Sequence, residues 1–145
     1  MKSLKVVFFI VAVFMAGSAY ALNADSVIGE WYNAEGTSLI NIHKCEAFYC
    51  GKIVWLKNPK DENGNEKVDS KNPDETKRSQ KLMGLPILWG FTYSGGNRWE
   101  DGKIYDPKKG KTYSCKMTLE GNQLNIRGFI GVSLLGRTTV WTRKQ

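Results

Sequence analysis

Histidine and cysteine are scarce in this 145-residue chain, which has one histidine and three cysteines. A single histidine excludes a histidine-rich zinc site, and a mixed site would need Cys45 and Cys50 in their reduced form. A Ser-His-Asp triad would have to use His43, and no nucleophile-elbow sequence accompanies it. The chain also lacks a Walker loop and a G-x-G-x-x-G motif. We therefore expect no metal and no cofactor, and an enzyme is the least favoured class of function.

One segment begins like a calcium loop, at Asp61-x-Asn63-x-Asn65. The pattern then fails, because Glu66 stands where a glycine is needed and Asn72 stands where a bidentate glutamate is needed. We expect no calcium site here.

Long apolar runs are also scarce, and the one that stands out is Val6–Ala16 near the start of the chain. Two lysines precede it, and Ala19-Tyr20-Ala21 follows as a cleavage site for signal peptidase. The run is too short for a membrane span, which needs about 20 residues. Residues 1–21 are therefore predicted as a secretory signal, with an uncleaved N-terminal anchor as the alternative. The mature domain would be residues 22–145, with no stable membrane span.

The chain carries a net charge of +7, which falls to +5 when Lys2 and Lys5 leave with the signal. A basic cytosolic domain with five tryptophans would suggest a nucleic-acid partner. An exported domain meets anionic lipid, polysaccharide or cell wall instead, and mild positive charge is also simply a soluble surface. We expect no nucleic-acid partner, and a location in the periplasm or outside the cell.

The three cysteines all lie in the predicted mature domain. Cys45 and Cys50 flank Glu46–Tyr49, a four-residue connection between two strand-like runs, and this spacing suits a disulfide across a hairpin end. A disulfide that closes so small a ring stabilises the folded state by only about 2 kcal/mol, so it constrains the turn more than it stabilises the fold. Cys115 is left over, on the apolar face of an alternating segment. It is predicted as a buried free thiol, with a reactive or intermolecular thiol as the alternative.

A period of two runs through almost the whole mature domain. The predicted strands are rich in β-branched and aromatic residues: Val27–Asn33, Ser38–Cys45, Lys52–Leu56, Ile87–Tyr93, Lys103–Tyr105, Thr112–Leu119, Gln123–Phe129 and Arg137–Arg143. Turn-forming residues separate them, as in Asp106–Gly110. Glu100 and Asp101 fall on an expected turn and face different ways, so they make a poor acid–base pair. The pattern predicts an all-β antiparallel sandwich or barrel with little helix.

The segment Lys57–Lys81 breaks this pattern, because it is polar throughout apart from Val68. An unstructured insertion of this length is unusual in a compact domain and is often functional or mobile. Asp74 followed by Glu75–Leu82 favours one short helix within it. The next stretch, Leu82–Trp89, is the most apolar of the mature domain and is suited to lining a pocket.

An eight-stranded barrel has an interior that holds packed side chains or one small ligand. The alternation predicts inward side chains on three strands, with space left at Gly128: Ile40, Ile42, Tyr113, Cys115, Met117, Leu119, Leu124, Ile126 and Ile130. Both faces of Ile53–Leu56 are apolar, so its phase stays open. These residues are compatible both with a filled core and with a ligand cavity.

Gly29-Glu30-Trp31 resembles the G-x-W opening of lipocalins. In that superfamily the tryptophan closes the base of the barrel and an arginine or lysine from a late strand packs over it. The resemblance implies that Gly29, Trp31 and Arg143 form this closure here, with Arg127 as the alternative to Arg143.

A longer series of motifs resembles a bacterial secreted family known only as a domain of unknown function. The motifs span Ile28–Arg143 in order and include Cys45-x4-Cys50-Gly51-Lys52-Ile53-Val54-Trp55-Leu56, Leu82-x-Gly84-Leu85-Pro86-Ile87-Leu88, Gly102-Lys103-Ile104-Tyr105-Asp106-Pro107 and Gly136-Arg137-Thr138-x2-Trp141. Structures in that family are lipocalin-like barrels. The resemblance therefore implies an eight-stranded antiparallel up-and-down barrel, and it implies no established activity.

We predict an exported barrel that binds a small, largely apolar ligand, such as a fatty acid, in its interior. The predicted ligand-binding residues are Ile40, Ile42, Tyr113, Met117 and Ile126, with Leu85, Leu88 and Trp89 near the mouth. The alternative is an envelope or host-facing interaction module with a filled barrel. In that case the segment Lys57–Lys81 and the basic surface would recognise a protein partner. The sequence leaves the oligomeric state open.

Overall fold

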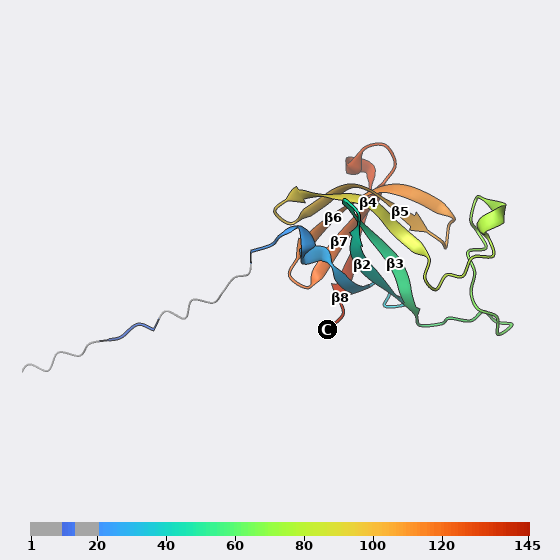
Figure 1. The fold of residues 1–145 in the computed structure, drawn as a ribbon, viewed down its shortest axis with the longest axis horizontal. Coiled ribbons are helices and arrows are strands. Elements are labelled where there is room, and N and C mark those ends of the chain that lie inside the picture. Colours follow the sequence, from blue (N-terminus) through green and yellow to red (C-terminus); the bar gives the residue numbers. More distant parts are fainter. Residues whose placement is uncertain (1–9, 14–20) are drawn as a thin grey trace, which may run out of the picture.

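The computed structural model describes residues 10–13 and 21–145, so most of the predicted signal, residues 1–21, lies outside the described residues. Within the described part, eight antiparallel strands form one closed barrel (Figure 1). They are β1 (Gly29–Tyr32), β2 (Ser38–Cys45), β3 (Phe48–Leu56), β4 (Pro86–Gly95), β5 (Arg98–Asp106), β6 (Lys111–Glu120), β7 (Gln123–Phe129) and β8 (Arg137–Arg143). Three short 3-10 helices accompany them: η1 (Ala24–Val27), η2 (Glu75–Lys77) and η3 (Ser133–Leu135). The predicted all-β barrel with little helix is confirmed.

Each strand pairs with the next along the chain, and β1 closes the barrel by pairing with β8 at Trp31 and Arg143. This up-and-down order places the connections alternately at the two ends of the barrel. We call the end that carries the β1–β2, β3–β4, β5–β6 and β7–β8 connections the open end. The other end, which carries η1 and the C-terminus, is the closed end. Among the described residues, no helix is long and apolar enough to cross a bilayer.

The strand bounds differ most from the prediction in β3 and β5. β3 begins at Phe48, so the hairpin turn holds only Glu46 and Ala47. Glu46 takes a left-handed backbone conformation, with φ of 54°. The turn expected at Glu100 and Asp101 is wrong, because β5 runs through both residues as an irregular strand. Asp101 has φ of 61° and the pairing with β6 shifts between Trp99 and Gly102, so the chain bulges and then continues.

The alternation of side chains places a buried row on the inner face of every long strand. On β3 the buried residues are Tyr49, Gly51 and Ile53, which settles the phase that the sequence left open. Ile130 lies beyond the inward row, at the mouth of the barrel, where it is one of the residues that line a cavity. β7 ends at Phe129, and the side chain of Ile130 is 73% exposed.

The polar segment between β3 and β4 is not an unstructured insertion. Antiparallel bridges join Lys60 to Glu66 and Val68 to Lys81, so the chain folds back on itself twice. The helix predicted over Glu75–Leu82 is wrong in length: η2 has three residues, capped by the Asp74 side chain. In Figure 1 this segment and the N-terminal η1 lie on opposite sides of the barrel.

Candidate functional site

The closed end is plugged by η1 together with the first and last strands. Trp31 is fully buried, and its Nε1 donates a hydrogen bond of 3.0 Å to the Val27 carbonyl in η1. The Arg143 guanidinium lies 4.2 Å from the centre of the Trp31 ring, a cation–π contact. Its nitrogens donate to the carbonyls of Ile28 and Ser26 at 3.0 and 2.7 Å. Burial lowers the pKa of this guanidinium below its usual value.

Glycine is required at position 29 because of this packing. Gly29 has φ of 142°, and a β-carbon there would lie 2.8 Å from Nη1 of Arg143. Gly29, Trp31 and Arg143 therefore form one unit at the closed end. Arg127, the alternative partner for Trp31, instead hydrogen-bonds the carbonyls of Ser133 and Leu134 at the open end.

Two further side chains fasten η1 to the barrel. Trp99 is fully buried and its Nε1 donates to the Ala24 carbonyl at 3.0 Å. The Tyr49 hydroxyl donates to a carboxylate oxygen of Asp25 at 2.7 Å. Burial and this carboxylate raise the pKa of Tyr49 to about 12. The closed end is therefore sealed by packed aromatic rings and hydrogen bonds.

The open end holds a cavity of about 600 Å³. Its wall is built from inward side chains of seven strands, β2 to β8: Ile40, Ile53, Ile87, Ile104, Tyr113, Ile126 and Trp141. Gly128 also faces it, where a side chain would come no nearer than 3.6 Å to Tyr113. A volume of this size falls within the range of small-molecule pockets, about 300–1,000 Å³. The barrel interior is therefore only partly filled by its own side chains.

The predicted ligand-binding residues divide into two groups. Ile40, Tyr113 and Ile126 line the cavity. The others lie outside its wall, and three of them, Ile42, Leu88 and Met117, are fully buried in the core. Leu85 is also buried in the core. Placing Trp89 near the mouth is wrong: it pairs with Lys103 in the middle of the sheet and its side chain is 39% exposed.

Several wall residues were not among the predicted ligand-binding residues. Ile53 belongs to the strand whose phase could not be assigned, and Ile104 belongs to a strand predicted as only three residues long. Ile87 was placed in a strand but not in the site. Trp141 follows from simple alternation on β8, where it is the most deeply buried residue.

The rim of the cavity is polar and carries an excess of basic side chains. Lys108 and Lys109 on the β5–β6 turn and Arg137 at the start of β8 line the rim together with Glu35 and Asp106. Asp106 belongs to the same turn as the two lysines, and its side chain accepts a hydrogen bond of 2.9 Å from the Lys108 backbone. Lys108, Lys109 and Arg137 are exposed to solvent. An apolar wall with basic groups at its entrance suits a ligand that has an apolar body and an acidic or polar head.

The β3–β4 segment adds a second hollow beside the first, with a volume of about 550 Å³. Ile53, Pro107 and Lys108 line both hollows, so the two adjoin at the open end. The lining of the second is more polar and includes Asp61, Lys67, Ser70 and Lys71 among its residues.

A buried aspartate fastens this segment to the barrel. Asp69 is fully buried, and it accepts hydrogen bonds of 2.7 Å from the Tyr105 hydroxyl and from the Asn72 amide. Burial and this carboxylate raise the pKa of Tyr105 to about 12. The segment also approaches the β5–β6 turn so closely that a β-carbon at Gly110 would collide with the Lys71 carbonyl. One side of the mouth is therefore walled by the segment between β3 and β4.

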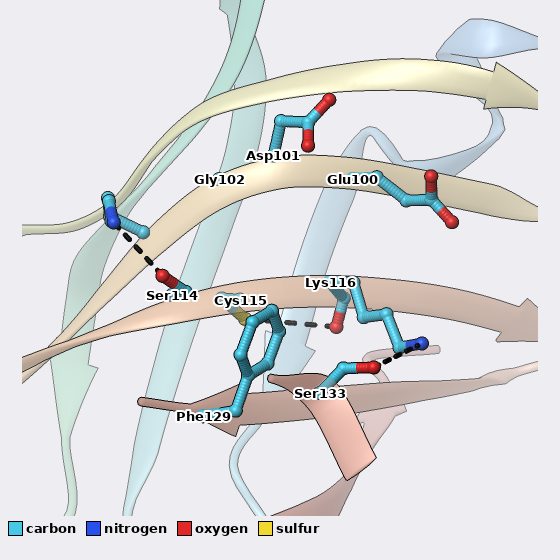
Figure 2. Close-up of a pocket in the computed structure, with 9 residues that line it drawn as sticks. Glu100, Asp101, Gly102, Ser114, Cys115, Lys116, Phe129 and Ser133 are labelled. Atoms are coloured by element: carbon cyan, nitrogen blue, oxygen red, sulfur yellow. Dashed lines mark hydrogen bonds between the residues drawn. The ribbon is translucent and has the colours of Figure 1, made fainter. Parts of the chain in front are cut away.

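A third hollow, of about 420 Å³, lies on the outer face of β5, β6 and β7 and is drawn in Figure 2. The Glu100 and Asp101 carboxylates point in different directions in this view. Lys116 and Ser133 approach each other at 3.5 Å, and Phe129 contributes the one aromatic ring. Its lining is charged and open to solvent, so it is a poorer ligand site than the apolar cavity.

The cysteines and the histidine lie away from the cavity wall. The predicted disulfide between Cys45 and Cys50 is present, with the two Cα atoms 5.9 Å apart. His43 Nε2 lies 3.3 Å from the Cys45 sulfur at the closed end. Cys115 is a buried free thiol, and burial raises its pKa to about 12, which suppresses its reactivity. No group of three or more metal-binding side chains occurs within residues 10–13 and 21–145.

Comparison with known proteins gives two matches. A family described as "Uncharacterized protein conserved in bacteria (DUF2147)" matches residues 29–143. Among solved structures, protein HP1028 from Helicobacter pylori, described as belonging to the lipocalin family, superposes with a TM-score of 0.70. The two share 21% sequence identity, over 81% of this chain and 82% of that protein. No curated protein matches by sequence. The likeness to HP1028 shows that the fold is a lipocalin-like barrel.

Proposed function

The chain belongs to the bacterial family DUF2147, and we propose that its lipocalin-like barrel binds a small, largely hydrophobic ligand at the open end. The observation that carries the proposal is the cavity of about 600 Å³, with its wall of isoleucines, Tyr113 and Trp141. Ile104 and Tyr113 are only half-buried in this wall, and an apolar ligand that covers apolar surface there gains about 25 cal/mol per Å². The alternative of an interaction module with a filled barrel receives no support from such an interior.

The charges at the rim narrow the class of ligand to one with an anionic head, for which a fatty acid is the simplest probe. Lys108, Lys109 and Arg137 stand at the entrance, above the apolar wall. A carboxylate held there stays hydrated and meets two or three cations, while its chain occupies the interior. Tyr113, on the wall itself, offers a hydroxyl for a second polar contact. We infer binding rather than catalysis, because the single histidine lies at the other end of the barrel.

We also infer export through residues 1–21, to the periplasm or the medium. The basic start, the apolar run and the small residues at 19–21 support it, and so does the disulfide, which is typical of oxidising compartments. Expression of the full chain in a bacterial host, followed by mass measurement of the exported product, tests this. A product that begins at Leu22 is expected, and an intact chain retained in the cytosol would contradict export.

Binding is tested by native mass spectrometry and by displacement of a fluorescent fatty acid from the delipidated protein. Wild type is expected to take up one fatty acid. Gly128→Leu adds bulk to the cavity wall, where a β-carbon would already contact Tyr113 at 3.6 Å and Ile104 at 3.7 Å, and it should lower affinity at least tenfold. Val140→Leu adds bulk to a 41%-exposed residue on β8 and is the matched control, with affinity unchanged.

Comparison of a fatty acid with the alcohol of equal chain length tests the head group. The acid should bind more tightly, and Arg137→Met should narrow that difference. Wild type that takes up neither compound, or equal affinity in Gly128→Leu and Val140→Leu, would contradict the proposal.

A further inference from the structure

The connection between β7 and β8 exposes four large aliphatic side chains at the open end. Ile130, Val132, Leu134 and Leu135 are 73%, 60%, 85% and 79% exposed. We call residues 130–135 the aliphatic loop. Scattered exposed apolar residues need no explanation, but four within six positions form a patch of the kind that marks a binding surface or a membrane contact.

The aliphatic loop is braced rather than left loose. Arg127 donates from Nε to the Ser133 carbonyl at 2.7 Å, from Nη2 to the Leu134 carbonyl at 3.2 Å, and from Nη1 to the Thr138 hydroxyl at 2.9 Å. Residues 133–135 form η3, and Gly136 passes so close to β7 that a β-carbon would lie 2.7 Å from the Gly128 carbonyl. The hydrogen bonds and close packing of the loop thus hold Leu134 and Leu135 in contact with solvent, although their exposure does not stabilise the fold.

Several basic side chains lie near the aliphatic loop, and the acidic Glu100 and Asp101 line the outer hollow that Lys116 and Ser133 share. Lys116 reaches the Ser133 hydroxyl at 3.5 Å, and Arg127 and Arg137 flank the loop on either side in sequence. Lys108 and Lys109 stand across the mouth of the cavity. The acidic groups that line the same mouth are Glu35 and Asp106, so the basic charge is in excess. Exposed aliphatic side chains with basic groups near them complement an anionic bilayer. Its phosphates attract the basic side chains, and its acyl region takes up the aliphatic ones.

We propose that the aliphatic loop docks the open end of the barrel on an anionic phospholipid bilayer. Ile130 and Leu135 belong both to this loop and to the lining of the cavity, so a docked barrel has its mouth against the acyl region. An apolar ligand then moves between bilayer and cavity without crossing water. This transfer rests on the proposed function, whereas docking itself needs no ligand.

The test is co-sedimentation of the purified, exported protein with vesicles of phosphatidylcholine alone or mixed with phosphatidylglycerol. Binding is expected to the mixed vesicles, at least tenfold stronger than to phosphatidylcholine alone, and it should weaken as salt is raised. The double variant Leu134→Ser with Leu135→Ser should lower binding to the mixed vesicles at least tenfold, because it removes the apolar part that enters the bilayer. Phe48→Ser is the matched control, since Phe48 is 45% exposed at the closed end, and it should bind as wild type.

Three results would overturn the docking proposal. Wild type that stays in the supernatant with both vesicles is one, and an equal loss in Phe48→Ser and the leucine double variant is another. The third is a dimer that forms without lipid and is lost in the leucine double variant, which would assign the aliphatic loop to a second copy of the chain. Fatty-acid uptake from lipid-free solution is measured on the same proteins, so failure of ligand binding is distinguished from failure of docking.

Discussion

The two ends of the barrel are built from the same strands and serve different purposes. At the closed end Trp31, Trp99 and Arg143 fill the space between η1 and the sheet, and each donates a hydrogen bond to a backbone carbonyl of the N-terminal segment. At the open end a cavity of about 600 Å³ reaches from the inward side chains to the loops at the mouth. We therefore expect side chains at the closed end to contribute more to stability than those at the open end.

The largest expected difference between the two ends is the loss of stability when an aromatic ring is removed. Trp31→Ala creates an enclosed void beneath η1 and should lower the free energy of unfolding by about 3–5 kcal/mol. Tyr113→Ala, on the wall of the cavity, enlarges a space that is already open and should cost about 1 kcal/mol. Urea unfolding followed by circular dichroism measures both. Equal losses would show that the two ends contribute alike.

A pair of arginines on β8 gives the next test. Arg143→Met keeps the apolar stem but removes two hydrogen bonds and the contact with Trp31, at a cost of about 2 kcal/mol. Arg137→Met, at the other end of the same strand, changes an exposed side chain and should stay within about 0.5 kcal/mol of wild type. If Arg137→Met were the more destabilising of the two, the assignment of the ends would be wrong.

Each end also carries one hydrogen bond between a tyrosine and an aspartate, which allows a smaller comparison. Tyr49→Phe removes the bond to Asp25 and should lower global stability by about 1 kcal/mol, because η1 then packs less firmly on the barrel. The change should appear in the urea midpoint with the slope of the transition unchanged. A shift no larger than that of Tyr93→Phe, whose hydroxyl bonds an exposed turn at Gly96, would contradict it.

The period of two in the sequence predicted an antiparallel sandwich or barrel, and the resemblance to lipocalin-like proteins then indicated the barrel. β2, β7 and β8 have the predicted bounds, because turn residues delimit clean alternation there. β5 was predicted too short, since Glu100, Asp101 and Gly102 have the composition of a turn and instead form a bulge inside a strand. Where the pairing of two strands is irregular, the period of two no longer predicts which face of the sheet a residue occupies.

The sequence did not predict how deep in the barrel each inward side chain lies. Ile40 and Ile42 point inward from the same strand, two residues apart, and both are buried in the core, yet only Ile40 also lines the cavity. Alternation specifies the face of the sheet but not the level within the barrel. Trp89 was misplaced for another reason: the β3–β4 pairing shifts twice, and Ile87 and Leu88 are both buried, which turns Trp89 outward.

The position of the segment between β3 and β4 depends on one contact, the burial of Asp69 against Tyr105. No pattern in the sequence predicts this contact. Aspartate, asparagine and lysine around it are typical of a solvated loop, so sequence reasoning favoured an unstructured insertion. A buried carboxylate is stable here because two donors satisfy it. Its partner lies 36 residues away on β5.

The smallest expected effect on global stability belongs to this contact. Tyr105→Phe leaves an oxygen of Asp69 buried without its donor, and the segment is expected to detach locally while the barrel stays folded. Hydrogen exchange at the Asp69 and Leu82 amides, which bond Gln80 and Lys67 within the segment, should accelerate. Protection that is lost equally throughout the strands would instead mean that the segment and barrel unfold together.

The same contact predicts a dependence on pH with a definite sign. The pKa of Tyr105 is raised from 10 to about 12 in the folded protein, so its contribution is complete below pH 10 and is lost as pH rises through 12. Tyr49 behaves in the same way at the closed end. Tyrosinate absorbance should therefore show one late-titrating step fewer in each tyrosine-to-phenylalanine variant. Ionisation of Tyr105 is expected to release only the segment between β3 and β4, whereas ionisation of Tyr49 weakens the packing of η1 on the barrel. The loss of global stability above pH 10 should therefore be smaller in Tyr49→Phe than in wild type. In Tyr105→Phe it should be almost the same as in wild type.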